Sequence, residues 1–233
     1  MEWGNFTPAH IISLLVAAAA IIGLGLGLKK ASRKVQTVVL GVLSFSGVAA
    51  IIFNLVAWDA PLQYLPLHLC SINAMLLPVA VLTRNKTIGN LLLVWCLGAL
   101  AALVLNYEMV SVDIFSWTFF FYYFPHVMEF GIPLLLIWLG LVKKDFRCIG
   151  STIGISAAIY TVVHFINLYI NANTDSWVNY MFSIQPTNPL TELFYQLIPC
   201  EYWYMYLVFP ILFVYLVIVY APEILAYFKR KKA

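Results

Sequence analysis

Residues 21–43 read IIGLGLGLKKASRKVQTVVLGVL, in which a short basic cluster separates two apolar runs. The whole chain repeats this arrangement, because all thirteen Lys and Arg residues fall into four clusters between apolar stretches. The clusters are Lys29, Lys30, Arg33, Lys34; Arg84, Lys86; Lys143, Lys144, Arg147; and Lys229, Arg230, Lys231, Lys232. Short loops rich in Lys and Arg are typical of the cytoplasmic side of membrane proteins. If the chain crosses the bilayer twice between successive clusters, every cation lies on that side.

The composition also indicates a membrane protein. Of the 233 residues, 63% are hydrophobic and 10% are charged, whereas about a quarter of the residues in a soluble domain are charged. The length suits one helical bundle, so we expect a single domain over residues 1–233. The formal net charge of +3 does not indicate nucleic-acid binding, because the basic residues form short loop clusters. The four cysteines show no C-x-x-C spacing, which argues against a zinc knuckle or a redox pair.

Seven apolar segments are long enough to cross the hydrocarbon core as helices, which takes about 20 residues. They are residues 9–28, 36–57, 66–83, 88–106, 115–142, 148–171 and 202–222. An odd number of spans with a basic tail predicts an all-α, multi-pass protein of the cell membrane, with the N-terminus outside and the C-terminus in the cytoplasm. No positively charged region precedes the first segment, so we expect no cleaved signal peptide.

The acidic residues test this orientation independently of the basic ones. Glu129 is the only acidic residue inside a predicted span, and Asp145 and Glu223 are expected at the inner side. All others fall at the outer side or its boundary: Glu2, Asp59, Glu108, Asp113, Asp175, Glu192 and Glu201.

One connection, residues 171–201, is much longer than the others. It contains Asn, Thr, Pro and many aromatic residues, and this aromatic content is not typical of disorder. Long loops in compact bundles are often functional lids. We therefore predict an ordered cap on the outer face, with a short helix near Pro189–Leu197.

Polar side chains inside membrane spans are costly and usually mark function. Three predicted spans carry them at matching depths, spaced three or four residues apart so that they share helix faces. They are His68, Cys70, Ser71 and Asn73 in span 66–83; Tyr122, His126 and Glu129 in span 115–142; and Tyr160, His164, Asn167 and Asn171 in span 148–171. A single buried histidine often only stabilises helix packing. Three of them at one level favour a polar site below the outer face.

Three motifs resemble the YwaF-like integral membrane proteins. They are LPLHLC at residues 65–70, a histidine, His126, after an aromatic run, and NYMF at residues 179–182 followed by Pro186. The resemblance covers about residues 60–220. This family includes a eukaryotic transmembrane acyltransferase that makes ether phospholipids by a cysteine-dependent route. The resemblance implies that Cys70 is the nucleophile and that His126 is the histidine of the fifth span.

The leading hypothesis is therefore acyl transfer on membrane phospholipids without a cofactor. The thiolate of Cys70 would attack a lipid ester carbonyl, and His126 or His164 would take its proton and return it to the leaving alcohol. Asn73 or Asn167 would donate to the oxyanion. Further residues expected to bind or orient the substrate are His68, Tyr122, Glu129, Asn179 and Tyr180.

Two alternatives remain open, and no protein partner is indicated. A catalytic zinc site of an intramembrane lipid hydrolase is one, since the chain resembles in outline the alkaline ceramidase-like hydrolases. The zinc ligands would be His68, His126, His164 and Glu129. A transporter or a lipid-binding protein is the other, because architecture does not fix function. A disulfide between Cys70 and Cys200 would remove the nucleophile and argue against acyl transfer.

Overall fold

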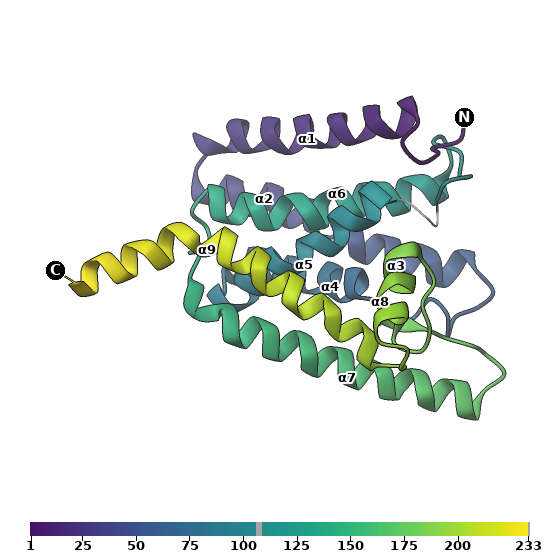
Figure 1. Cartoon of the computed structure of the whole chain (residues 1–233). Coiled ribbons are helices and arrows are strands. Elements are labelled where there is room, and N and C mark those ends of the chain that lie inside the picture. Colours follow the sequence, from purple (N-terminus) through teal and green to yellow (C-terminus); the bar gives the residue numbers. More distant parts are fainter. Residues whose placement is uncertain (106–108, 233) are drawn as a thin grey trace. The chain divides into compact units, whose positions relative to one another are not determined.

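The computed structural model describes residues 1–105 and 109–232, and its regular secondary structure within those ranges is helical (Figure 1). Glu108, predicted on the outer side, lies outside the described residues. The internal contacts of the chain define two compact units, Met1–Lys143 and Lys144–Ala233. Each unit is described by itself below.

The first unit is a set of helices joined by short loops. Its helices are α1 (Pro8–Lys29), α2 (Arg33–Ser44), α3 (Ser46–Ala57), α4 (Leu69–Thr83), α5 (Lys86–Leu105) and α6 (Trp117–Trp138). Three of them begin at a hydroxyl side chain, of Thr7, Ser32 or Ser116, that accepts a hydrogen bond from a backbone N–H of the first turn. Such N-caps satisfy backbone donors that have no partner inside the helix.

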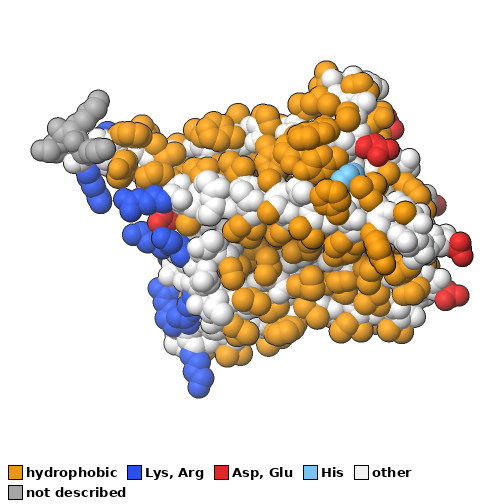
Figure 2. All heavy atoms as spheres, turned by 90° about the horizontal axis from the view of Figure 1, so that it is seen from below, with side chains coloured by type: hydrophobic (Ala, Val, Ile, Leu, Met, Phe, Trp, Pro, Cys, Tyr) orange, Lys and Arg blue, Asp and Glu red, His pale blue; other side chains and the backbone are white. Residues whose placement is uncertain are grey.

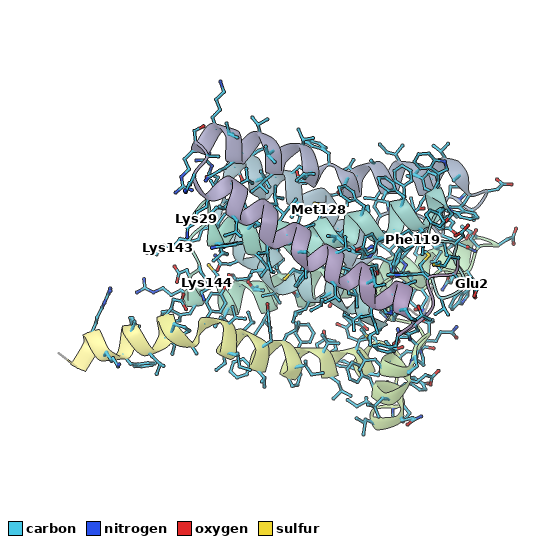
Figure 3. All side chains as sticks on the ribbon, turned by 90° about the horizontal axis from the view of Figure 1, so that it is seen from above. Glu2, Lys29, Phe119, Met128, Lys143 and Lys144 are labelled. Atoms are coloured by element: carbon cyan, nitrogen blue, oxygen red, sulfur yellow. The ribbon has the colours of Figure 1, made fainter. Side chains whose placement is uncertain are left out.

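Helix α6 is the centre of the first unit, because α1, α2, α3, α4 and α5 all pack against it. Lys29 and Lys143 lie at one end of this unit and Glu2 lies at the other (Figure 3). In the same view, Phe119 marks the Glu2 end of α6, and Met128 lies near the middle of the helix. We call the end that carries Lys29 and Lys143 the basic end.

Helices α4 and α6 run in the same direction. Arg84, which follows α4, donates to the hydroxyl of Thr37 in α2 at 2.7 Å. Arg33, one turn earlier in α2, donates to the carbonyl of Leu139, which follows α6, at 2.5 Å. Both helices therefore finish against the start of α2, at the basic end.

Six segments are long and apolar enough to cross a membrane among the described residues. They are Pro8–Lys29, Arg33–Ala57, Lys86–Leu105, Trp117–Trp138, Phe146–Asn173 and Trp203–Arg230. The predicted span 36–57 is divided at Phe45 into α2 and α3. The predicted span 66–83 forms the 15-residue helix α4, which at about 1.5 Å per residue is shorter than the hydrocarbon core of about 30 Å. Apolar side chains spread over the face in Figure 2, as expected for a multi-pass membrane protein.

The second unit contains two long helices and a folded connection. Its elements are the 3₁₀ turn η1 (Phe146–Cys148), α7 (Ile149–Asn173), η2 (Tyr180–Phe182), α8 (Pro189–Leu197), η3 (Trp203–Leu207) and α9 (Val208–Lys232). Helix α8 lies at the predicted residues. The side chain of Asn188 accepts from the N–H of Thr191, and the hydroxyl of Thr191 accepts from the N–H of Asn188, which forms a capping box.

Candidate functional site

His126 is oriented by its own helix. Its Nδ1 lies 2.6 Å from the carbonyl oxygen of Tyr122, and because a carbonyl only accepts, Nδ1 carries the hydrogen. In the neutral imidazole, Nε2 then keeps its lone pair. The ring of Tyr122 lies 4.4 Å from the imidazole, and its hydroxyl donates to the carbonyl of Ala102 in α5 at 3.1 Å. The histidine is thus held in a form that can accept a proton.

Asn73 of α4 and Glu129 of α6 lie at the same level of the first unit. Asn73 comes eleven residues before Arg84, and Glu129 comes ten residues before Leu139. Since both helices finish at the basic end, each side chain lies roughly 15–17 Å from that end at 1.5 Å per residue. This is about half the thickness of a hydrocarbon core.

Cys70 and His126 lie one turn further from the basic end. Each comes three residues before Asn73 or Glu129, a difference of roughly 5 Å along the helix. Cys70 is half-buried in the first turn of α4, and His68 occupies the N-cap position of that helix. Helices α4 and α6 pack against each other, so the thiol and the imidazole occupy the same level of two neighbouring helices.

Besides Asn5 near the N-terminus, three polar side chains of the first unit have enclosed atoms that make no hydrogen bond, namely half-buried Ser46 and the buried Asn73 and Glu129. These atoms are Ser46 Oγ, both amide atoms of Asn73, and Glu129 Oε2. Asn73 is 0% exposed and Glu129 is 3% exposed. Their helices meet at Gly47, where a Cβ would lie 2.5 Å from the Cβ of Ala74 and 3.3 Å from Oε1 of Glu129. We call Ser46, Asn73 and Glu129 the buried polar cluster.

Two prolines add backbone acceptors at this level. Pro78 in α4 and Pro133 in α6 lack the N–H that would bond to the carbonyl four residues earlier. The carbonyls that lose this helical donor belong to Ala74 and Glu129. A buried polar group without a partner costs about 1–3 kcal/mol, so the buried polar cluster reduces the stability of the fold. This cost is typical of a site that is completed by a ligand.

The described residues do not fit the predicted zinc site. No group of three or more His, Cys, Asp or Glu side chains among them lies close enough to hold a metal ion. A catalytic zinc ion needs three protein ligands around one point.

His164 and Asn167 of α7 hold the cap in the second unit. The amide nitrogen of Asn167 donates to the carbonyl of Tyr180 at 2.9 Å and to the hydroxyl of Ser183 at 2.8 Å. Its amide oxygen accepts from the N–H of Tyr180 at 3.0 Å. His164 Nδ1 lies 3.1 Å from the same Ser183 hydroxyl. Both amide hydrogens of Asn167 are therefore used, and none remains for the predicted oxyanion contact.

Two further asparagines continue this attachment. Asn171 donates to the carbonyl of Val178 at 2.9 Å and accepts from its N–H at 2.7 Å. Asn179 donates to the carbonyl of Gln185 at 2.8 Å and accepts from the N–H of Ile184 at 3.0 Å, within the cap itself. We call His164, Asn167, Asn171 and Ser183 the cap anchor. Its hydrogen bonds fix the path of the chain over the C-terminal half of α7.

The cap anchor also holds an unfavourable backbone turn. Met181 and Phe182 have φ angles of +53° and +56°, a left-handed conformation that residues with a Cβ rarely adopt. The bonds to Tyr180 and Ser183 lie on both sides of this turn. Conformations of this kind persist only where the surroundings over-determine them, so the cap anchor acts as a rigid clamp.

Three residues at these sites carried no functional signal in the sequence. Ser46 and Ser183 are hydroxyl residues that commonly bond within helices and turns. Tyr202 lies 4.8 Å from the ring of His164, and its hydroxyl bonds to Thr161 at 2.7 Å. Tyrosine is common at membrane interfaces for other reasons, so its position next to a histidine became evident only from the structure.

The comparisons with known proteins concern most of the chain. The model of the TMEM164 family matches residues 5–220, a range that contains the buried polar cluster and the cap anchor. No curated protein and no solved structure matches the chain.

Proposed function

The chain belongs to the TMEM164 family, and we propose that it is an enzyme of the cell membrane that transfers acyl groups from phospholipid esters to a lipid alcohol. One observation carries this proposal, namely that Cys70 of α4 and His126 of α6 occupy one level of two packed, parallel helices. A thiol becomes a nucleophile when a base within reach takes its proton. The resemblance of LPLHLC to the YwaF-like proteins, a family that includes a cysteine-dependent acyltransferase, supports the same assignment.

We also propose seven membrane crossings, with α4 as the third. The end of α4 contacts α2 at the basic end, while its first turn lies a helix length, roughly 22 Å, toward the opposite end. This direction matches that of α6, which is a full span. With the basic clusters in the cytoplasm, the N-terminus lies outside and the C-terminus lies inside.

In the first half of the reaction, the proton of the Cys70 thiol passes to Nε2 of His126. The sulfur bonds to the carbonyl carbon of a phospholipid ester, and Asn73 donates an amide hydrogen to the oxyanion. The ester C–O bond then breaks, and the leaving alcohol takes the proton from His126. The products are a lysophospholipid and an acyl thioester on Cys70.

In the second half, the hydroxyl oxygen of the acceptor alcohol bonds to the acyl carbon. The C–S bond to Cys70 breaks, and the hydroxyl proton passes through His126 to the departing sulfur. The thiol is restored and a new ester leaves. We assign the base to His126, because its helix, α6, packs against α4, which carries Cys70.

The test is an acyl-transfer assay on purified protein in lipid nanodiscs. The donor is a phospholipid with a labelled acyl chain, and the acceptors are hexadecanol, diacylglycerol and lysophospholipid. We expect Cys70→Ala to abolish transfer and His126→Ala to reduce it by at least about 100-fold, the usual contribution of a general base. The labelled acyl group should be recovered on the Cys70 peptide by mass spectrometry.

Cys200→Ser is the matched control, since it removes an exposed thiol that the mechanism does not use. It should transfer acyl groups at the unchanged rate, which would also argue against a required Cys70–Cys200 disulfide. Full transfer by Cys70→Ala would refute the thiol mechanism.

A further inference from the structure

The short helix α8 of the cap has an apolar face that the rest of the described chain leaves exposed. We propose that this face binds the lipid surface, at the boundary between head groups and acyl chains, so that α8 lies in the plane of the membrane. The assignment of this surface to the outer leaflet rests on the orientation proposed above, whereas the contact with lipid does not.

Three leucines form the exposed apolar face of α8. Leu190, Leu193 and Leu197 follow one another at spacings of three and four residues, so they make one stripe along the helix. Their side chains are 41%, 51% and 65% exposed. We call these three residues the leucine stripe. Transfer of apolar surface out of water is favourable, so a lipid surface that covers the stripe stabilises this position of the helix.

The other sides of α8 face protein and water. Thr191 and Phe194, on the side next to the leucine stripe, are buried, and α8 packs there against η3. Glu192 and Gln196 lie on the side away from Phe194 and are exposed. The leucine stripe thus separates a protein-facing side from a polar side. A helix that lies in a membrane interface beside a protein has this order of contacts, with its apolar side in the lipid and its polar side in water.

Helix α8 is attached to the start of a membrane-spanning segment. The ring of Tyr195 lies edge-on to the ring of Tyr204 in η3, with the centroids 5.4 Å apart, and Tyr204 is fully buried. The residues of η3 begin the segment Trp203–Arg230, which is long and apolar enough to cross a membrane. Trp203 is 55% exposed, as is typical of tryptophan at a membrane interface. The leucine stripe therefore lies beside the point where this segment enters the bilayer, and it continues the lipid-facing surface of that segment.

The direction and the length of α8 also suit a helix in the membrane plane. Figure 1 shows α8 lying across the direction of α7 and α9, the two long helices of the second unit. Helix α8 has nine residues, a length of roughly 13 Å at 1.5 Å per residue. This is less than half of the hydrocarbon core of about 30 Å, so α8 meets lipid along its side and does not cross the bilayer.

The charges of the second unit define the kind of lipid surface that fits. Residues 148–228 contain no Lys or Arg, while Glu192 on α8 and Glu201 beside η3 are both acidic and exposed. Binding through α8 therefore depends on burial of the leucines and gains nothing from anionic head groups. We expect the same depth of insertion in a zwitterionic membrane and in a membrane that also contains anionic lipid.

Spin labels on α8 test this proposal in the full-length protein. The background carries Cys70→Ala and Cys200→Ser, and its two remaining cysteines are buried. One label is attached after Leu193→Cys and, as the matched control, one after Gln196→Cys, and each protein is placed in phosphatidylcholine nanodiscs. Power-saturation EPR compares collisions with oxygen, which dissolves in lipid, and with a nickel chelate, which stays in water. We expect the label of Leu193→Cys to lie about 5–10 Å inside the head-group boundary, and that of Gln196→Cys to lie in water.

A second position keeps the test independent of any one variant. Leu197 is the most exposed leucine of the stripe, so a label attached after Leu197→Cys displaces no packed side chain. It should report the same depth as the label of Leu193→Cys. Added phosphatidylglycerol should leave both depths unchanged.

Four results would overturn the proposal. More collisions with the nickel chelate than with oxygen at Leu193→Cys would show that the leucine stripe faces water. Few collisions with either reagent would show that protein covers it, from a second copy or from another part of the chain. Equal depths for Leu193→Cys and Gln196→Cys would show that α8 does not lie in the plane with the leucines toward lipid. Insertion that requires phosphatidylglycerol would assign the contact to anionic head groups. None of these outcomes depends on acyl transfer, so the proposal and the proposed function fail separately.

Discussion

The buried polar cluster and the cap anchor each contain an asparagine that is fully buried, yet the two side chains behave in opposite ways. Asn167 makes three hydrogen bonds to the cap, whereas both amide atoms of Asn73 are enclosed without one. The two residues have the same type and the same burial, so neither property distinguishes a structural asparagine from one that could bind a ligand. The hydrogen-bond partners separate them: Asn167 stabilises a loop, and Asn73 is available to a ligand.

Removing the amide at Asn167 should have the largest effect on stability. Asn167→Leu would leave the N–H and carbonyl of Tyr180 and one bond of Ser183 unsatisfied, at about 1–3 kcal/mol for each buried group. We expect a loss of about 3 kcal/mol or more in the stability of the cap. Hydrogen exchange of residues 178–183, compared with that of α7, measures it. Unchanged protection in the variant would show that this amide does not anchor the cap.

A substitution at Gly47, where α3 closely approaches α4, should have the next largest effect on stability. Gly47→Ala places a Cβ 2.5 Å from that of Ala74, so α3 must move away from α4 at a cost of about 1–3 kcal/mol. Gly27→Ala is the control, because nothing lies within 4 Å of a Cβ there, and alanine favours a helix by about 1 kcal/mol. In detergent, the midpoint of thermal unfolding should be lower for Gly47→Ala and higher for Gly27→Ala than for the unchanged protein. Equal midpoints would contradict the tight helix crossing.

The effect of Asn73→Leu on the free energy of unfolding should be opposite in sign to that of Asn167→Leu. The substitution at Asn73 removes two enclosed polar atoms that have no partner and replaces them with an apolar side chain of similar size, which is close to neutral or stabilising. We expect the free energy of unfolding to stay the same or to rise by up to about 1 kcal/mol. A loss as large as that of Asn167→Leu would mean that Asn73 is bonded in the native protein, and the contrast between the two sites would fail.

The smallest effect on stability is expected for an exposed ion pair, between the N-terminal ammonium group and Asp113. The ammonium group of Met1 donates to Asp113 at 2.8 Å, and this bond, with one from the N–H of Phe115, holds the pKa of Asp113 below its ordinary value of 3.8. A lowered pKa stabilises the fold above the ordinary value, and this contribution disappears as the pH falls through the lower value of the folded state. A carboxyl NMR titration should show the depressed pKa, and acetylation of the N-terminus should raise it. No change on acetylation would exclude the contact.

Local signals account for most of the fold that could be predicted from the sequence. The apolar runs predicted the long helices, and helix α8 lies at the predicted residues, because a proline at its first position and an asparagine before it are strong start signals. No proline lies near the break at Phe45, but Ser44 precedes it and Ser46 and Gly47 follow it, and Ser/Gly pairs are a known cause of helix kinks that the prediction of one span over 36–57 did not use. Helices α2 and α3 both pack against α4 and α6, so a change of neighbours does not account for the break.

Because polar side chains inside membrane spans are costly, the sequence predicted five of them equally as site residues: Asn73, Glu129, His126, His164 and Asn167. The sequence could not separate the two asparagines, because Asn167 finds its partners only when the cap folds back and Asn73 has none. Tyr180 and Ser183 reach Asn167 only after the cap turns back onto α7. Ser46 escaped notice because a serine in an apolar helix usually bonds to its own backbone. The division into an anchor and a polar cluster without protein partners is therefore a property of tertiary structure.

The bond from Arg33 to Leu139 has a consequence for biosynthesis. Arg33 leaves the ribosome 106 residues before Leu139, so the first helices are made long before its later partner exists. The same guanidinium then closes the end of α6 and also contacts Gln36 at 3.2 Å. A lysine would keep the positive charge but would lack the planar fork for this geometry. The backbone partner of Arg33 is thus made only when the central helix is complete.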